Sequence, residues 1–342
     1  MKITFKPKQV VSSLLAELQD RSRDIVERRY GLTGKDAEGM TLEAIGSIYG
    51  ITRERVRQIE NFSIATIRKS EAYANAKPAF DELIDAMLGH GGLVREDIFL
   101  KSFSTDLTVQ NQINFLLTIG EAFTRIKEDD SFHHRWALDS DHAECVHRSI
   151  NNLYKTISTE DLIEETKLLE DFLGHLKGEI TERVDEVHAR GWLDISKLIS
   201  SNPLGEWGRS DSSNIRTRGM KDFAYLVLRK KGVPMHFSEV ANEIEKTFNR
   251  KAHVATTHNE LIKDDRFVLV GRGLYALSDW GYTNGIVRDV IKKILEDRGS
   301  LSKDKIVEEV MKQRKVKENT IYVNLQNSKY FRKDTKGRYS LV

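Results

Sequence analysis

Two helix-forming segments separated only by Gly50 and Ile51 constrain the fold of this chain more than any other feature of its sequence. Residues 42–49 place apolar side chains at helical spacing, and Thr41 precedes them as a candidate N-cap. Thr52 can cap a second helix that extends to about Lys69. Two helices joined by such a short turn are typical of a helix-turn-helix, a motif whose second helix lies in the DNA major groove.

The second helix has one apolar and one polar side when residues are placed at about 100° intervals. The apolar side carries Val56, Ile59, Ser63 and Ile67. The polar side lies near the helix N-terminus, where a helix-turn-helix meets base edges, and carries Arg53, Glu54, Arg57, Gln58 and Asn61.

These side chains match the chemistry of base edges, because arginine can bond guanine, a carboxylate can accept from cytosine and glutamine can address adenine. We add Thr52 to the predicted DNA-binding set, and we assign Arg55 and Arg68 to DNA phosphates. Exposed helices also carry such residues merely as helix formers. The capped turn and the segregated polar side favour the DNA interpretation.

After residue 80 the chain repeats one pattern three times, with helical segments followed by two short strand-like segments around a polar turn. The predicted strand pairs are 123–126 with 135–138, 266–270 with 273–277, and 330–333 with 338–341. This order predicts winged helices. Helical periods between residues 141 and 200, with a strand-like segment at 192–195, leave a degenerate fourth winged helix open.

The predicted fold class is therefore mainly α with small β wings, built from tandem helix-turn-helix and winged-helix modules. We expect five parts, and residues 200–214 are the clearest linker, although Leu204 and Trp207 indicate that part of it packs down. The parts are a helix-turn-helix at 1–77, a winged-helix-like part at 78–140, a helical part with the linker at 141–215, a winged helix at 216–281 and a basic winged helix at 282–342.

Charge is unevenly distributed, although the formal net charge is only +2. Lys and Arg number 14 against 10 Asp and Glu over residues 1–80, and 12 against 24 over 81–200. The corresponding numbers are 13 against 10 over 201–280 and 15 against 8 over 281–342. The basic ends can follow a phosphate backbone, whereas the acidic middle favours contact with protein. Charge runs of this kind also occur as simple solvated faces.

Several classes of protein are disfavoured by the same sequence. We expect no membrane segment, because no stretch approaches about 20 apolar residues, and the single Cys145 suits a reducing compartment, so we expect a cytoplasmic, nucleoid-associated protein. The histidines lack the paired spacing of a zinc site, and no phosphate-binding or hydrolase motif occurs. We expect no catalytic residues, no metal site, no cofactor and no enzymatic activity.

The helix-turn-helix lies in a segment, residues 18–69, that resembles region 4 of sigma-70 family factors. The resemblance rests on residues 28–32, residues 41–46 and the run from Thr52 to Glu60. In that family, region 4 reads the minus-35 promoter element and docks on the flap of the RNA polymerase β subunit. The resemblance implies that Arg53, Glu54, Arg57 and Gln58 contact bases and the adjacent backbone.

The resemblance to sigma factors covers only about 50 residues, and nothing else resembles the aromatic-rich region that melts the minus-10 element. We therefore expect an accessory protein rather than a complete sigma factor. Residues 216–281, on the motifs at 222–225, 235–240 and 273–280, resemble the HARE-HTH winged helix. That domain resembles one in the delta subunit of bacterial RNA polymerase and in some restriction and chromatin proteins.

The sequence therefore predicts a sequence-specific DNA-binding transcription regulator or an RNA polymerase accessory factor, with duplex DNA and the polymerase core as partners. One alternative is an interaction protein that binds polymerase without specific DNA readout. Another is the DNA-recognition component of a restriction or repair system.

Overall fold

The computed structural model describes residues 3–33, 38–177, 184–282, 285–314 and 316–342. The chain divides into two compact units, the first formed by Met1–Ser200 and Trp207–Ser210 and the second by Ser201–Glu206 and Asp211–Val342. Within the described ranges, no helix is long and apolar enough to cross a membrane. The fold is mainly α-helical with small antiparallel sheets, which confirms the predicted fold class.

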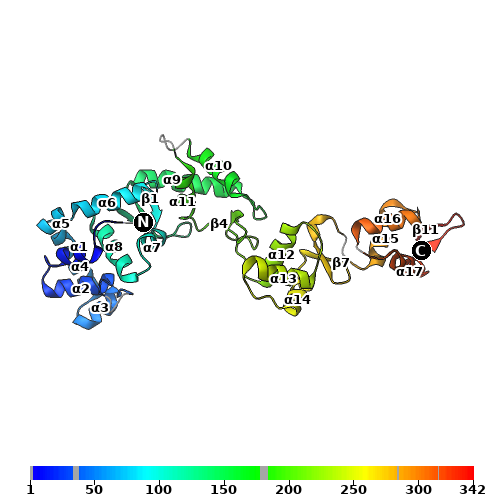
Figure 1. Ribbon diagram of the computed structural model, residues 1–342, viewed down its shortest axis with the longest axis horizontal. Coiled ribbons are helices and arrows are strands. Elements are labelled where there is room, and N and C mark those ends of the chain that lie inside the picture. Colours follow the sequence, from blue (N-terminus) through cyan, green and yellow to red (C-terminus); the bar gives the residue numbers. More distant parts are fainter. Residues whose placement is uncertain (1–2, 34–37, 178–183, 283–284, 315) are drawn as a thin grey trace. The chain divides into compact units, whose positions relative to one another are not determined.

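The first unit begins with a group of helices (Figure 1). These are α1 (Pro7–Leu15), α2 (Asp20–Tyr30), α3 (Leu42–Tyr49), α4 (Arg53–Arg68) and α5 (Glu71–Asn75). The two predicted N-caps are confirmed, because the Thr41 side chain accepts from the Ala44 N–H and the Thr52 side chain accepts from the Arg55 N–H, each at 3.2 Å. Such caps satisfy amide groups that have no partner inside the helix.

A winged helix follows in the same unit. It comprises α6 (Lys77–Leu88), β1 (Leu93–Arg95), α7 (Glu96–Phe103), α8 (Leu107–Ile119), β2 (Thr124–Ile126) and β3 (Arg135–Ala137). The sheet order is β1-β3-β2. One hydrophobic core joins this winged helix to the N-terminal helices, and it contains Leu14 of α1, Val26 of α2, Ile67 of α4 and Phe115 of α8.

The last part of the first unit is a reduced version of the same fold. It contains α9 (Ser140–Thr156), α10 (Glu165–Leu176), α11 (Glu186–Leu193), β4 (Ile199–Ser201) and β5 (Trp207–Arg209). Ile163, which precedes α10, exchanges backbone hydrogen bonds of 2.8 and 2.7 Å with Trp207 of β5. The Ile163 bridge therefore takes the position of the first strand of the preceding winged helix, because both pair with the last strand. The degenerate winged helix left open by the sequence has the corresponding topology here.

One sequence expectation for this part was wrong. Residues 192–195 are not a strand, because Trp192 and Leu193 end helix α11 and are buried. The segment 200–214 includes one end of β4 and all of β5, and Trp207 is only 3% exposed. Part of the segment expected as a linker therefore packs down, as its apolar side chains indicated.

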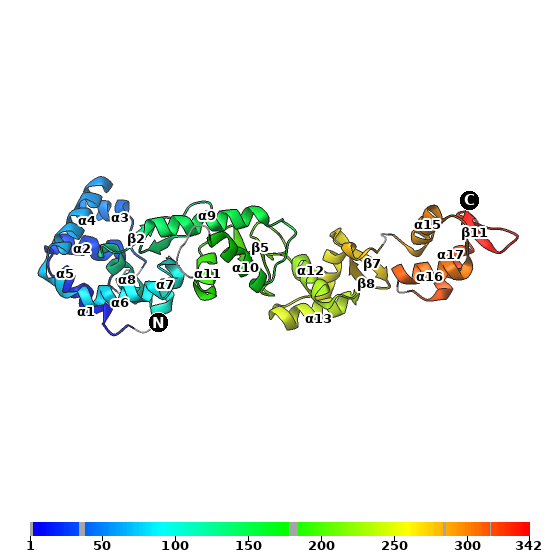
Figure 2. The same ribbon diagram turned by 90° about the horizontal axis from the view of Figure 1, so that it is seen from above.

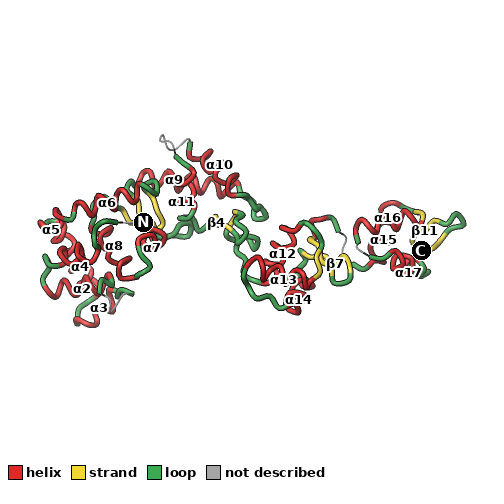
Figure 3. The backbone as a smooth tube through the Cα atoms, viewed as in Figure 1, coloured by secondary structure: helices red, strands yellow, loops and turns green. Residues whose placement is uncertain are grey.

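The second unit contains two further winged helices, whose helices and short strands are distinguished by colour in Figure 3. The first comprises α12 (Met220–Lys231), β6 (Met235–His236), α13 (Phe237–Phe248), α14 (Val254–Lys263), β7 (Phe267–Gly271) and β8 (Leu274–Leu277), followed by a 3-10 turn at Ser278–Trp280. The second comprises α15 (Val287–Arg298), β9 (Leu301–Ser302), α16 (Lys303–Gln313), α17 (Glu318–Leu325), β10 (Phe331–Lys333) and β11 (Arg338–Leu341).

The sheets of the second unit repeat the topology of the first winged helix, with orders β6-β8-β7 and β10-β11-β9. In each case the last strand lies between the other two. The two winged helices have separate hydrophobic cores, one around Leu228 and Ile244 and the other around Ile291 and Ile306. The sequence pattern did not reveal the short first strands, because two or three residues before a helix give too little alternation to detect.

Candidate nucleic-acid interface

The helix-turn-helix is held by a small core of its own. Ile25 of α2, Ile45 of α3 and Val56 of α4 are each 0% exposed and form one cluster. Helices α2, α3 and α4 lie together in the N-terminal part of the chain (Figure 2). This core fixes α4 by its apolar side and leaves the other side in solvent.

The turn between α3 and α4 depends on two glycines. Gly50 ends α3 with φ of 61°, a left-handed conformation that favours glycine. A Cβ atom on Gly46 would lie 2.6 Å from the carbonyl oxygen of Ile51. The Ile51 N–H also donates to the Gly46 carbonyl at 3.0 Å. The close approach of α3 to the turn therefore requires a residue without a side chain at position 46.

The apolar side of α4 is buried as its periodicity predicts. Val56, Ser63 and Ile67 are each 0% exposed, and Ile59 is partly buried. Ser63 is a polar member of this side, and its hydroxyl donates to the Ile59 carbonyl at 2.7 Å. A hydrogen bond within the helix thus satisfies the one buried hydroxyl on this face.

The polar side of α4 is exposed along the first half of the helix. The exposed predicted residues are Thr52, Arg53, Glu54, Arg55, Arg57, Gln58 and Asn61. Their exposure brings the predicted side chains together on one solvent-facing surface, which we call the α4 surface. It is at the N-terminal end of the helix, where the helix dipole also favours an anion.

Two contacts pre-arrange side chains on the α4 surface. Arg57 donates to both carboxylate oxygens of Glu54, at 2.9 and 2.6 Å, and Arg55 donates to the Gln58 side-chain oxygen at 3.1 Å. The hydrogen bond from Arg57 lowers the pKa of Glu54, and the same bond raises the pKa of Arg57. Both groups face water, so this ion pair contributes little to stability and can be exchanged for a contact with a base or phosphate.

Arg68 lies at the opposite end of α4 from these residues. Its Nε donates to the Ile119 carbonyl at 2.9 Å, and a terminal nitrogen donates to the Thr118 carbonyl at 3.3 Å. These carbonyls are at the C-terminus of α8, where a cation is favourable. Arg68 therefore joins α4 to α8 at the end of the helix opposite the α4 surface, and its contact with a DNA phosphate stays a prediction.

A hollow of about 380 Å³ lies beside the start of α3 and is lined by Arg29, Thr41, Leu42, Glu43 and Arg53. Arg29 donates to the Met40 carbonyl at 3.0 Å, and its Nε is 3.6 Å from a Glu60 carboxylate oxygen. The sequence had marked Arg29 only as part of a family motif. In the structure Arg29 of α2 is hydrogen-bonded to the segment that precedes α3.

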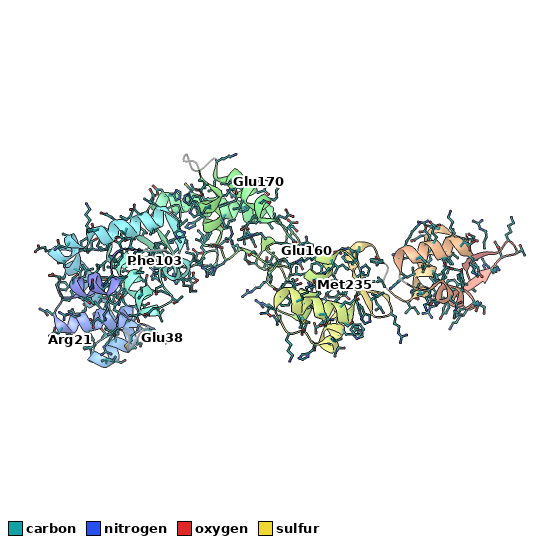
Figure 4. All side chains as sticks on the ribbon, in the orientation of Figure 1. Arg21, Glu38, Phe103, Glu160, Glu170 and Met235 are labelled. Atoms are coloured by element: carbon teal, nitrogen blue, oxygen red, sulfur yellow. The ribbon has the colours of Figure 1, made fainter. Side chains whose placement is uncertain are left out.

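Other side chains of this region had no predicted role. Phe62 is 72% exposed on α4, although it is a large apolar residue. The Arg21 guanidinium lies 5.3 Å from the centre of the Tyr49 ring, and Figure 4 labels Arg21 among the N-terminal helices. Among the described residues, no group of three or more His, Cys, Asp or Glu side chains is arranged to hold a metal ion.

Comparison with known proteins identifies two segments of the chain. Residues 14–69 match the family model for sigma-70, region 4. Residues 218–280 match the HARE-HTH model, whose description names ASXL and a restriction endonuclease HTH domain. Both resemblances that the sequence motifs indicated are therefore confirmed. The first match contains α2, α3 and the α4 surface, and the second contains the winged helix from α12 to β8.

One relative is the RNA polymerase principal sigma factor HrdD of Streptomyces griseus, which is 33% identical over 67 residues. The matched part is 20% of this chain and 20% of that protein. The similarity is thus local to one region in each chain. Most of this chain therefore lies outside the matched part.

Proposed function

We propose that this protein is a transcription-associated regulator or RNA polymerase accessory factor that reads promoter-like duplex DNA through the α4 surface. The observation that carries the proposal is the capped helix-turn-helix with its exposed row of base-reading side chains, within a segment that matches sigma-70 region 4. In this proposal Arg53, Glu54, Arg57, Gln58 and Asn61 meet base edges, whereas Thr52 and Arg55 meet the adjacent phosphates.

The pair formed by Glu54 and Arg57 suggests how specificity arises. With Glu54 in place, Nε and one terminal nitrogen of Arg57 each donate to the carboxylate, and the three remaining N–H groups of the guanidinium can bond a guanine in the two-pronged manner. A phosphate opposite Glu54 repels its carboxylate, whereas a cytosine amino group can donate to it. The pair therefore orients Arg57 for a guanine, and Glu54 penalises sites that offer it no donor.

The test is a selection of bound duplexes from a randomised pool with the full chain, followed by fluorescence anisotropy on the enriched and scrambled sequences. Changing Arg53 and Arg57 to Ala should lower affinity for the enriched duplex by roughly 10- to 100-fold and leave the scrambled duplex much less affected. The matched control changes two exposed lysines elsewhere in the first unit, Lys101 and Lys155, to Ala. This control variant should retain the preference for the enriched over the scrambled duplex. Equal preference in parent and α4 variant would refute readout by α4.

A second candidate function is polymerase binding without base readout, and the exposure of Phe62 favours it. A phenylalanine that is 72% exposed on α4 offers apolar contact area to a protein partner. Under this alternative, Phe62→Ser weakens capture of purified bacterial RNA polymerase core, while Arg53→Ala has no effect on it. Under the first proposal, Arg53→Ala changes the selected DNA sequence and Phe62→Ser does not.

A further inference from the structure

The four winged-helix folds of this chain differ in whether their third helix and wing are free to meet a ligand. In the first, the third helix α8 buries Gln112, Ile113, Phe115, Leu116, Leu117 and Ile119, and it packs against α1, α2 and α4. A helix covered on this scale cannot also enter a DNA groove. The third helix of this winged helix is therefore part of the core of the first unit.

The wing of the same winged helix is also covered, because it contacts the segment after α11. Phe132 is 4% exposed, and backbone hydrogen bonds of 2.9 and 2.8 Å join His133 to Ile195 and Ser131 to Lys197. Lys197 additionally lies 3.1 Å from the Glu128 carboxylate. This wing contacts the segment after α11. Its carboxylates would moreover repel a phosphate backbone.

The next two winged helices offer few cations at their wings. In the reduced one, α11 buries Ala189, Trp192 and Leu193, and several acidic residues of this region are exposed, among them Glu160 and Glu170, which Figure 4 labels. In the winged helix from α12 to β8, the turn between β7 and β8 is short and has Arg272 as its single cation. Neither arrangement provides a row of positive charge.

The C-terminal winged helix differs in charge. Residues 285–342 contain 15 Lys and Arg against 8 Asp and Glu, a net charge of +7. Four of the cations lie on or beside the hairpin of β10 and β11 and are exposed, namely Arg332, Lys333, Lys336 and Arg338. We call these four the wing cations. None of them forms an ion pair within the ranges that the structure describes.

The single carboxylate of this hairpin, that of Asp334, is hydrogen-bonded within its own turn. Asp334 accepts from the backbone N–H groups of Lys336 and Arg338 at 2.9 and 2.8 Å. Arg332 donates to the Ser340 hydroxyl at 3.0 Å across the two strands, which orients its guanidinium without neutralising it. The wing therefore presents positive charge on a hydrogen-bonded hairpin.

More cations gather at the base of the wing, around the ring of Tyr330. The cationic groups of Lys292, Arg288 and Lys329 lie 4.2, 4.6 and 5.7 Å from its centre. Arg288 is also paired with Asp289 at 3.4 Å, whereas no ion pair is present for Lys292 or Lys329 among the described residues. A bound polyanion would offset the repulsion between these cations. At the start of the third helix α17, Lys317, Asn319 and Thr320 are exposed, as is Glu318, whose carboxylate accepts from the Tyr322 hydroxyl at 3.0 Å.

From these observations we infer that the C-terminal winged helix is a second binding surface for duplex DNA, which contacts phosphates through the wing cations. This surface contributes affinity without sequence preference, since phosphates carry no base information. The inference does not depend on base readout by α4. It assigns a nucleic-acid contact to the C-terminal winged helix, whereas the third helix and the wing of the first winged helix are covered.

The test measures salt dependence with the full chain and a scrambled duplex of about 30 base pairs between about 50 and 200 mM KCl. The wing variant changes Arg332, Lys333, Lys336 and Arg338 to Gln. If each cation neutralises one phosphate, the slope of log affinity against log salt becomes shallower by up to about 3.6, because each contact contributes about 0.9. Over this salt range, the parent should then lose roughly 100-fold more affinity than the variant.

Two control variants make the result specific. A charge-conserving variant, with Arg332 and Arg338 changed to Lys and Lys333 and Lys336 changed to Arg, should bind with the parental slope. Changing four exposed lysines of the first unit to Gln, at Lys8, Lys101, Lys155 and Lys177, should also leave the slope near the parental value. An equal loss in this control would overturn the inference, because the effect would then follow net charge alone.

The outcomes for the two DNA surfaces are distinguishable. The Arg53 and Arg57 variant should lose sequence preference while the wing contribution to the salt slope remains, and the wing variant should keep the preference. A wing variant with the parental slope on duplex DNA would overturn the inference even if α4 reads bases. The inference also fails if the wing variant loses binding only to a single-stranded oligonucleotide of equal length.

Discussion

Replacement of Gly46 by alanine tests whether the close approach of α3 to the turn holds the helix-turn-helix in place. The new Cβ would lie 2.6 Å from the Ile51 carbonyl oxygen, whereas ordinary van der Waals contact of a Cβ atom begins at 3.4 Å. The turn must therefore move by about 0.8 Å to reach ordinary contact. Overpacking of this kind costs about 1–3 kcal/mol, and the gain in helix propensity offsets only about 0.5–1 kcal/mol of it.

The net expectation is that Gly46→Ala destabilises the helix-turn-helix by about 1–2 kcal/mol. Gly174 is a matched control in the same unit, because it also lies inside a helix, α10, and a Cβ there would meet no atom within 4 Å. Gly174→Ala should therefore stabilise by about 0.5–1 kcal/mol. The two substitutions make the same chemical change with opposite expected signs.

The assay is hydrogen exchange by mass spectrometry on peptides that cover residues 42–60, together with urea unfolding of the full chain. Gly46→Ala should speed exchange of these peptides, and Gly174→Ala should leave them unchanged. If Gly46→Ala slowed exchange or raised the unfolding midpoint as Gly174→Ala does, the turn would tolerate a side chain. Position 46 would then have no part in fixing the placement of α4.

Three further predictions follow from ionisable groups. Burial lowers the pKa of His147 from 6.5 to about 4, so the unfolded chain takes up the proton first as the pH falls. The free energy of unfolding of the first unit should therefore fall by about 2–3 kcal/mol as the pH falls from 6.5 to about 4. Urea titrations of His147→Gln should show a smaller fall over the same pH range. Arg266→Leu leaves the buried Asp222 carboxylate without its 3.0 Å ion pair and should destabilise the second unit by about 3 kcal/mol in the same assay, whereas the exposed Arg272→Leu should be neutral. Glu54→Gln removes a negative charge from the α4 surface, so affinity for scrambled duplexes should rise. The ratio of the affinities for the enriched and scrambled duplexes, measured by anisotropy, should therefore fall. An unchanged ratio would contradict the role assigned to the pair of Glu54 and Arg57.

The parts of the fold that the sequence predicted are those set by local physics. Thr41 and Thr52 cap helices through amides three residues away, and the apolar spacing of α4 selects its buried side without reference to the rest of the chain. The strand pairs of the hairpins were also predicted well, because short apolar strand-like segments around a polar turn, with a glycine in the last two hairpins, are a short-range signal. Periodicity and capping were therefore sufficient for the helix-turn-helix and the positions of the wings.

The features that the sequence did not predict include contacts between residues far apart in the chain. Arg68 donates to carbonyls about 50 residues along the chain, and no local pattern distinguishes such a cation from one that meets a phosphate. Trp192 ends a helix in a position that its apolar neighbours made look strand-like. Strand β5 pairs with β4 in a local hairpin, and its bridge to Ile163 joins residues far apart in sequence. Distant contacts account for the role of Arg68 and for this bridge.

Winged-helix topology alone does not identify a DNA-binding element in this chain. The order of helices and strands is shared by folds in which the third helix is buried, as α8 is, and by one whose wing bears four exposed cations. Burial and charge, rather than topology, determine what each fold can bind, because a covered helix cannot enter a groove and an acidic wing repels phosphate. A chain that duplicates one fold can thus use some copies as framework and keep one for nucleic acid. Base readout by α4 and phosphate contact by the C-terminal wing would then contribute separately, the first to specificity and the second to affinity and its dependence on salt.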